Sequence, residues 1–100
     1  MHLISYDITD DRLRLKASKL LIRYGLLRVQ YSVFMGDIKD VALAKLRNGL
    51  DKLVQTPQWT PEDTLMILPL HQYTEDNLTF LGKAPERWME ISGELHTLVL

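Results

Sequence analysis

The sequence predicts a single α+β domain in which two helices cover one face of a β-sheet. Two segments repeat apolar residues at helical spacing, and the other segments alternate apolar and polar residues or are short apolar runs. The predicted order is strand, helix, strand, helix and then three further strands. A length of 100 residues suits one domain, residues 1–100, with a modest hydrophobic core.

The first strand is predicted over residues 2–8 and the first helix from there to about Arg23. In the strand, alternation gives two faces: Ile4, Tyr6 and Ile8 on one, and Leu3, Ser5 and Asp7 on the other. Thr9-Asp10-Asp11 supplies side chains that cap a helix N-terminus. The apolar stripe of the helix consists of Leu13, Ala17, Leu20, Leu21 and Tyr24. Gly25 stands where a helix C-terminal glycine is expected.

The middle of the chain predicts a strand, a helix and a loop. Residues 26–35 form one β-rich segment with alternating side chains, ended by Gly36-Asp37. A second helix is predicted from about Lys39 to Val54. Its apolar positions are Leu43, Leu46, Leu50 and Leu53. Residues 56–63 contain two prolines and read as a loop.

The last third predicts three short strands. Residues 65–70 are apolar on both faces, which is typical of a strand covered on both sides, and Pro69 must lie at a strand end or bulge. A turn is predicted at residues 75–77, a strand at 78–81 and a final strand at 95–100. Residues 82–93 show no clear pattern.

Two helices on one face leave the other face of the sheet bare. We assign to it Leu3, Ser5, Asp7, Phe34 and one side of residues 65–70. A partly apolar bare face on so short a chain favours association with a second copy.

The formal net charge of −1 hides an uneven distribution. Residues 12–36 contain six basic residues and no acidic one, whereas residues 62–100 contain seven acidic and two basic residues. Arg12, Lys16, Lys19 and Arg23 recur at helical spacing. Such a stripe is either an ordinary solvated helix face or a surface for a nucleic-acid backbone.

Several classes of site are excluded. The chain has no cysteine, which rules out disulfides, thiolate zinc sites and cysteine nucleophiles. Its longest apolar run has six residues, whereas a membrane helix needs about 20. We therefore expect a cytoplasmic protein with no membrane partner. The three histidines lack metal-pair spacing, and the sequence has neither a glycine-rich phosphate loop nor a nucleophile elbow.

Asp7 is the candidate for chemistry. A carboxylate in an otherwise apolar strand must be hydrogen-bonded, paired, metal-bound or at the rim, so an equal alternative is that Asp7 caps the first helical turn or simply ends the strand. Asp10 and Asp11 are explained as helix N-terminal residues. Mg²⁺ needs only one or two carboxylates besides water and substrate phosphates, and a two-fold axis near Asp7 supplies two from one position.

Three segments together resemble the CRISPR-associated Cas2 family, whose members take part in spacer acquisition. They are Tyr6-Asp7-Ile8-Thr9-Asp10-Asp11 followed by Arg14, then Tyr24-Gly25-Leu26, and then Arg28-Val29-Gln30-Tyr31-Ser32-Val33-Phe34-Met35-Gly36. The motifs cover about the first third of the chain. The remainder agrees in element order.

The resemblance implies a ferredoxin-like β-α-β-β-α-β sandwich with an extra C-terminal strand, in a homodimer with facing sheets. Residues 95–100 are then expected to join the partner's sheet. Asp7 is implied as the catalytic residue and as the ligand of Mg²⁺ or Mn²⁺ in phosphodiester cleavage, with the two Asp7 residues approaching across the dimer axis.

The basic stripe and the resemblance together give the expected nucleic-acid contacts: Arg12, Arg14, Lys16, Lys19 and Arg28. Lys16 stands where some relatives have arginine, which keeps the charge but loses bidentate phosphate geometry. We expect Tyr6 to pack in the core and Phe34 to pack at the dimer face.

The implied function is a magnesium-dependent endonuclease, on RNA or DNA, in spacer acquisition for antiviral defence. The alternative is a structural adaptor without catalysis, bound to duplex DNA and to the CRISPR integrase subunit. Asp7 favours the nuclease function, whereas the lack of a second carboxylate in the same strand argues against it. A toxin-like ribonuclease is a third reading, which genomic context would separate. The basic stripe and the missing ligand loop argue against a metabolite-binding regulatory domain.

Overall fold

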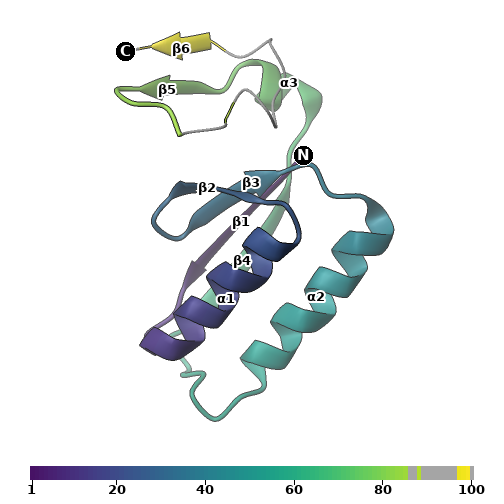
Figure 1. Cartoon of the computed structure of the whole chain (residues 1–100), viewed down its shortest axis with the longest axis vertical. Helices are drawn as coiled ribbons and strands as arrows, with labels where there is room; N and C mark the ends of the chain where they lie inside the picture. The colour runs from purple at the N-terminus through teal and green to yellow at the C-terminus, as the bar shows by residue number, and fades with distance from the viewer. Residues whose placement is uncertain (86–87, 89–96, 100) are drawn as a thin grey trace.

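The main body of the protein is a four-stranded antiparallel sheet with two helices on one face (Figure 1). The computed structural model describes residues 1–85, 88 and 97–99. The elements are β1 (His2–Asp7), α1 (Asp11–Arg23), β2 (Leu27–Gln30), β3 (Val33–Gly36), α2 (Asp40–Val54), β4 (Thr64–Pro69), α3 (Gln72–Asp76), β5 (Thr79–Leu81) and β6 (Thr97–Val99). The sheet order β2-β3-β1-β4 confirms the ferredoxin-like fold.

The central strand β1 decides which residues face the helices. Ile4 and Tyr6 are buried, and Ile4 pairs in register with Phe34 of β3 and Ile67 of β4. Because paired residues of antiparallel strands share a face, these side chains form the sheet's half of the core. The helices contribute the other half through Leu13, Ala17, Leu21, Leu46 and Leu50. The predicted apolar stripes of both helices are confirmed.

Helix α1 begins and ends at the predicted signals. The Asp10 carboxylate accepts a hydrogen bond from the Leu13 backbone N–H at 2.9 Å, which satisfies one free donor of the first turn. Beyond the helix, Gly25 has φ +86°, a left-handed conformation that favours glycine.

The prediction of one strand over residues 26–35 is wrong. The segment forms β2 and β3, joined by a tight hairpin turn at Tyr31 and Ser32, and the register shifts between Arg28 and Gln30. A register shift of this kind breaks the simple alternation of a strand. The turn contains no Gly, Asn or Pro, so the usual signal of a hairpin is missing from the sequence. The turn predicted at residues 75–77 is also wrong, because α3 occupies most of it.

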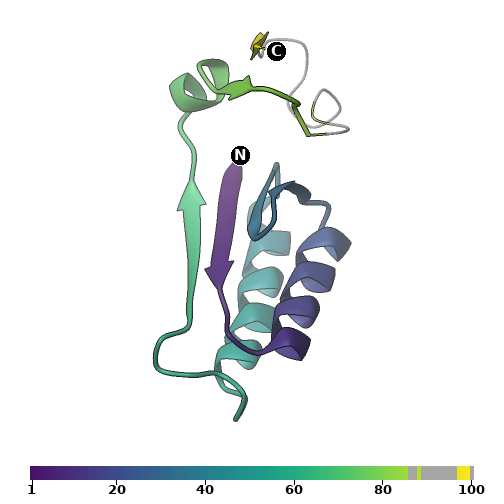
Figure 2. The same ribbon diagram turned by 90° about the vertical axis from the view of Figure 1, so that its left-hand side faces the viewer.

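The bare face of the sheet exists, but Phe34 does not lie on it. Phe34 is fully buried on the helix-covered face, where its ring stacks on Tyr6 with centroids 6.1 Å apart. The β2–β3 hairpin reverses the chain and puts Phe34 in register with Ile4, which sequence alternation over a single strand does not reveal. Figure 2 shows α1 and α2 together on one side of β1 and β4, which leaves the other side open.

The bare face carries apolar side chains beside Asp7. Met66 and Leu68 of β4 are 49% and 43% exposed, and they pair in register with Ser5 and Leu3 of β1. We call these four residues, together with Asp7, the open face. The prediction that Asp7 lies opposite Ile4, Tyr6 and Ile8 is confirmed.

A second small sheet lies beyond the end of the main one, where β5 pairs with β6 in parallel (Figure 1). The prediction for residues 82–93 and for positions 95, 96 and 100 falls largely outside the described residues. The exchange of the C-terminal strand with a partner stays a prediction. Among the described residues, no helix is both long enough and apolar enough to cross a membrane.

Candidate metal site and nucleic-acid surface

Asp7 ends β1 on the open face. Its side chain is exposed, and in register it stands opposite Thr64 of β4. Among the described residues, its carboxylate has no hydrogen bond or ion pair. Asp7 does not cap the first helix, because Asp10 holds the N-cap position. Asp7 does end β1, as the other form of the structural alternative predicts. Asp7 is therefore a carboxylate free to bind a ligand.

Asp7 is one carboxylate that a magnesium ion could use as a ligand. Within the part of the chain that the structure describes, no three His, Asp or Glu residues cluster as a metal site. One chain thus offers one carboxylate, and a second copy facing it would offer another. Mg²⁺ commonly keeps several waters and takes one or two carboxylates, so two Asp7 residues match its requirements.

The neighbouring carboxylates are already in use. Asp10 caps α1, and Asp11 pairs with the Arg14 guanidinium. Arg14 also donates hydrogen bonds to the backbone carbonyls of Ile8 at 2.9 Å and Thr9 at 3.2 Å. Arg14 therefore holds the loop that follows Asp7, and its guanidinium is only partly available for a phosphate.

Asp63 holds the same loop from the other side. Its carboxylate accepts hydrogen bonds from the Thr9 backbone N–H at 3.0 Å, the Thr9 hydroxyl at 2.9 Å and the Thr60 backbone N–H at 2.8 Å. The bond from Thr60 contributes most to holding the pKa of Asp63 below its ordinary value of 3.8; desolvation acts the other way, and the bonds from Thr9 lower it further. Asp63 was not among the predicted site residues; the signal for it in the sequence is an aspartate at the end of a proline-containing loop before a strand.

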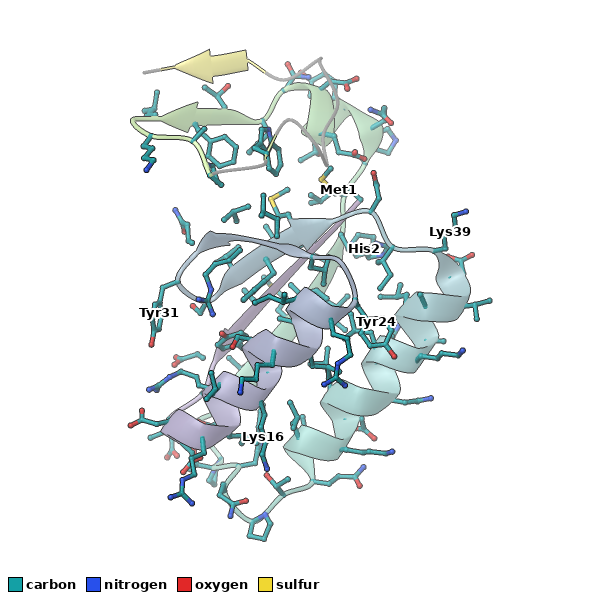
Figure 3. The ribbon with its side chains drawn as sticks, in the orientation of Figure 1. Met1, His2, Lys16, Tyr24, Tyr31 and Lys39 are labelled. Atoms are coloured by element: carbon teal, nitrogen blue, oxygen red, sulfur yellow. The ribbon has the colours of Figure 1, made fainter. Side chains whose placement is uncertain are left out.

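The basic stripe on α1 is a surface feature. Arg12, Lys16, Lys19 and Arg23 are all exposed along one side of the helix, and Figure 3 shows Lys16 extending from it. Arg12 and Lys16 line a hollow of about 480 Å³ together with Gln58 of the loop before β4. We call these four basic residues the α1 stripe. They place four positive charges on one exposed side of α1, but they lie away from the open face.

Arg28 lies with aromatic rings on the opposite side of α1. The central carbon of its guanidinium is 5.0 Å from the Phe34 ring centroid and 6.0 Å from that of Tyr31. With Tyr6 and Arg14 it lines a hollow of about 360 Å³, which we call the hairpin hollow. Tyr31 was not among the predicted site residues, because a tyrosine in a β-rich segment is usually a strand residue.

The structure therefore divides the predicted site residues into three groups. Tyr6, Arg14 and Arg28 meet at the hairpin hollow. Arg12, Lys16 and Lys19 share the α1 stripe, and Asp7 lies on the open face. Phe34 lies beneath Arg28 and belongs to the core.

Comparison with known proteins identifies related chains. Residues 1–77 match the family model described as CRISPR associated protein Cas2. A protein named CRISPR-associated endoribonuclease Cas2 1, from Archaeoglobus fulgidus, is 39% identical over 72 residues, which are 72% of each chain. One from Synechocystis, CRISPR-associated endoribonuclease Cas2 3, is 38% identical over 85% of this chain and 87% of that one. A crystal structure of hypothetical protein TT1823 from Thermus thermophilus has a TM-score of 0.67 at 34% identity, covering 84% of this chain and 92% of that chain.

Proposed function

Since this chain belongs to the family of CRISPR-associated Cas2 proteins, we propose that it is a metal-dependent endonuclease of CRISPR defence that acts as a homodimer in spacer acquisition. The related proteins from Archaeoglobus and Synechocystis carry the name endoribonuclease, which supports cleavage of RNA. The single observation that carries the proposal is Asp7, an exposed carboxylate at the end of β1 that pairs with none of the residues the structure describes.

The open face supports a dimer. Met66 and Leu68 expose large apolar side chains beside Leu3 on a sheet face that neither α1 nor α2 covers. Burying such side chains between two copies stabilises an interface by about 25 cal/mol for each Å² of apolar surface removed from water. A two-fold axis through the open face brings the two Asp7 residues together, as the resemblance implies.

The two Asp7 carboxylates would hold Mg²⁺ or Mn²⁺ at this axis. The ion, when bound, lowers the pKa of water and offsets negative charge on the phosphate under attack. The chain's own residues do the rest. Asp7 supplies anionic ligands, while Arg14 and Asp63 fix the loop beside it from two directions. Exposed basic side chains on α1 hold the phosphate backbone.

The test compares cleavage of single-stranded RNA by the wild type and Asp7→Asn across a magnesium titration. Asn keeps the shape of the side chain and removes the charge, so we expect loss of cleavage with unchanged folding. Glu62→Gln is the matched control, because Glu62 is an exposed carboxylate on the loop before β4. Sedimentation at micromolar concentration accompanies the assay. Equal cleavage by wild type and Asp7→Asn would refute the catalytic role, and a folded monomer would refute the shared site.

A structural adaptor for duplex DNA and the CRISPR integrase is the second candidate, favoured by the α1 stripe. Replacing Arg12, Lys16 and Lys19 by glutamine should weaken duplex binding alike for all sequences. It should also lower the slope of log affinity against log salt by up to about 2.7, since each phosphate contact contributes about 0.9. The control replaces three exposed bases of α2: Lys45, Arg47 and Lys52. An unchanged slope would place the duplex elsewhere. If the protein acts as an adaptor without catalysis, Asp7→Asn should leave duplex binding intact.

A further inference from the structure

We infer that the hairpin hollow binds one unpaired nucleotide, with its base stacked on Tyr31 and its phosphate on Arg28. The inference rests on the proposed nucleic-acid function and adds to it a binding subsite with Tyr31 as the stacking residue. Three features support this subsite: the exposure of Tyr31, the positive charge of Arg28 and the position of the hollow at the Asp7 end of β1.

Tyr31 presents an aromatic ring to solvent. It occupies the β2–β3 turn and is 74% exposed, and Figure 3 shows its side chain pointing away from the sheet at the tip of the hairpin. A ring this exposed contributes little to the core. Its position is nevertheless defined, because the carbonyl of the next residue, Ser32, accepts a hydrogen bond from the Tyr6 backbone N–H at 3.1 Å.

Arg28 supplies positive charge beside the ring. Its side chain is exposed, and it forms no ion pair with any residue that the structure describes. Its guanidinium contacts the Phe34 and Tyr31 rings, which limit the directions it can take. At the opposite wall, the charge of Arg14 is balanced by Asp11. The hollow therefore keeps one net positive charge, which suits one phosphate.

The walls of the hollow match a nucleotide in kind and size. Leu15 and Ser18 of α1 line it together with Tyr31, so it offers an aromatic ring and an aliphatic side chain. The Ser18 hydroxyl donates a hydrogen bond to the Leu15 carbonyl at 2.8 Å. Leu15 is 53% exposed, so its side chain is accessible to a ligand in the hollow. The volume of about 360 Å³ lies at the lower end of small-molecule sites, which span about 300–1,000 Å³.

The chemistry selects an unpaired base. Within a duplex the faces of the bases are stacked on one another, so only a single strand or an open end presents a free face to Tyr31. Base–aromatic stacking is tolerant of sequence, and the adjoining phosphate is shared by RNA and DNA. Because Ser32 bonds to Tyr6, the residue before Asp7, a nucleotide held here lies at the Asp7 end of β1.

The experiment measures binding of fluorescein-labelled oligouridine, oligothymidine and a DNA duplex by anisotropy, with EDTA present. We expect Tyr31→Ala to weaken binding of both single strands about 5- to 150-fold, the range of one stacking contact. Tyr31→Phe keeps the ring and should stay within about twofold of wild type. Duplex affinity should not change. Arg28→Gln should weaken single-strand binding and lower its salt slope by about one.

Tyr73→Ala is the matched control, because Tyr73 is 73% exposed on α3, away from the hollow. The inference is overturned if wild type binds neither single strand, if Tyr31→Ala binds them as wild type does, or if Tyr31→Ala loses single strands and duplex equally. Since EDTA removes metal, binding is read apart from cleavage. If single-strand binding depends on Tyr31 but cleavage does not depend on Asp7, the proposed nuclease function is rejected and the nucleotide site in the hairpin hollow is retained. If cleavage depends on Asp7 but single-strand binding does not depend on Tyr31, the nuclease function is retained and the nucleotide site is rejected.

Discussion

Replacing Phe34 by alanine tests whether this residue acts through the fold. Phe34 is fully buried, stacks on Tyr6 and lies beneath the Arg28 guanidinium. Removing a buried phenylalanine ring costs about 3–5 kcal/mol, through lost burial and the cavity left behind. Native domains commonly have a free energy of unfolding of about 5–15 kcal/mol, so the variant should lose a large share of its stability.

Urea denaturation measures this loss, with fluorescence from Trp59, which packs against the core, as one probe. Protein concentration must be fixed, because dimerisation adds to apparent stability. Tyr31→Ala is the control and should change the unfolding free energy by less than about 0.5 kcal/mol, since its ring is exposed. A loss below about 1 kcal/mol in Phe34→Ala, at an unchanged denaturant slope, would refute the core placement of Phe34. If the expected result is obtained, a loss of activity in Phe34→Ala reflects loss of the folded structure.

Two further predictions concern backbone space and acid stability. Gly36→Ala should destabilise by about 1–3 kcal/mol, because a Cβ there would lie 3.3 Å from the Leu26 Cα and 3.4 Å from a backbone oxygen. Gly49→Ala should instead be neutral or stabilise the protein by up to about 1 kcal/mol, because the added Cβ would meet only the flexible side chain of Leu20 and alanine has a higher helix propensity than glycine. Thermal melts in which Gly36→Ala is more stable than Gly49→Ala would contradict both predictions. The lowered pKa of Asp63 contributes stability that is present above pH 3.8 and is lost as the pH falls through the pKa of the folded state. The free energy of unfolding should therefore fall more steeply with acidification in the wild type than in Asp63→Asn. Parallel curves of unfolding free energy against pH would contradict this prediction.

The sequence sufficed for most elements because their signals are local. Helix periodicity, the Asp10 cap and Gly25 predicted α1, and alternation in β1 predicted which side of the sheet carries Asp7. The β2–β3 hairpin was missed because its turn is set by pairing with β1 and by a register shift, neither of which has a signal at Tyr31 or Ser32. Missing the turn also placed Phe34 on the wrong face.

The candidate site was predictable in its residue types and not in its grouping. Asp7, Arg14 and Arg28 were all identified, yet only the fold shows that Arg14 holds the loop after Asp7 and that Arg28 lies over aromatic rings. Tyr31 and Asp63 depend on contacts between segments far apart in the chain. Asp63 reaches Thr9 across 54 positions, and no local pattern announces such a bond.

Adjacent positions of β1 serve different surfaces, which constrains how such a chain can change over generations. Tyr6 belongs to the core and the hairpin hollow, whereas Asp7 belongs to the open face. A point substitution can therefore alter one surface and spare the other. Inserting or deleting one residue in β1 cannot, since it moves every following side chain to the opposite face. We expect natural variation in this strand to proceed by exchange of residues at constant length, so that binding and cleavage can be gained or lost separately along different lineages.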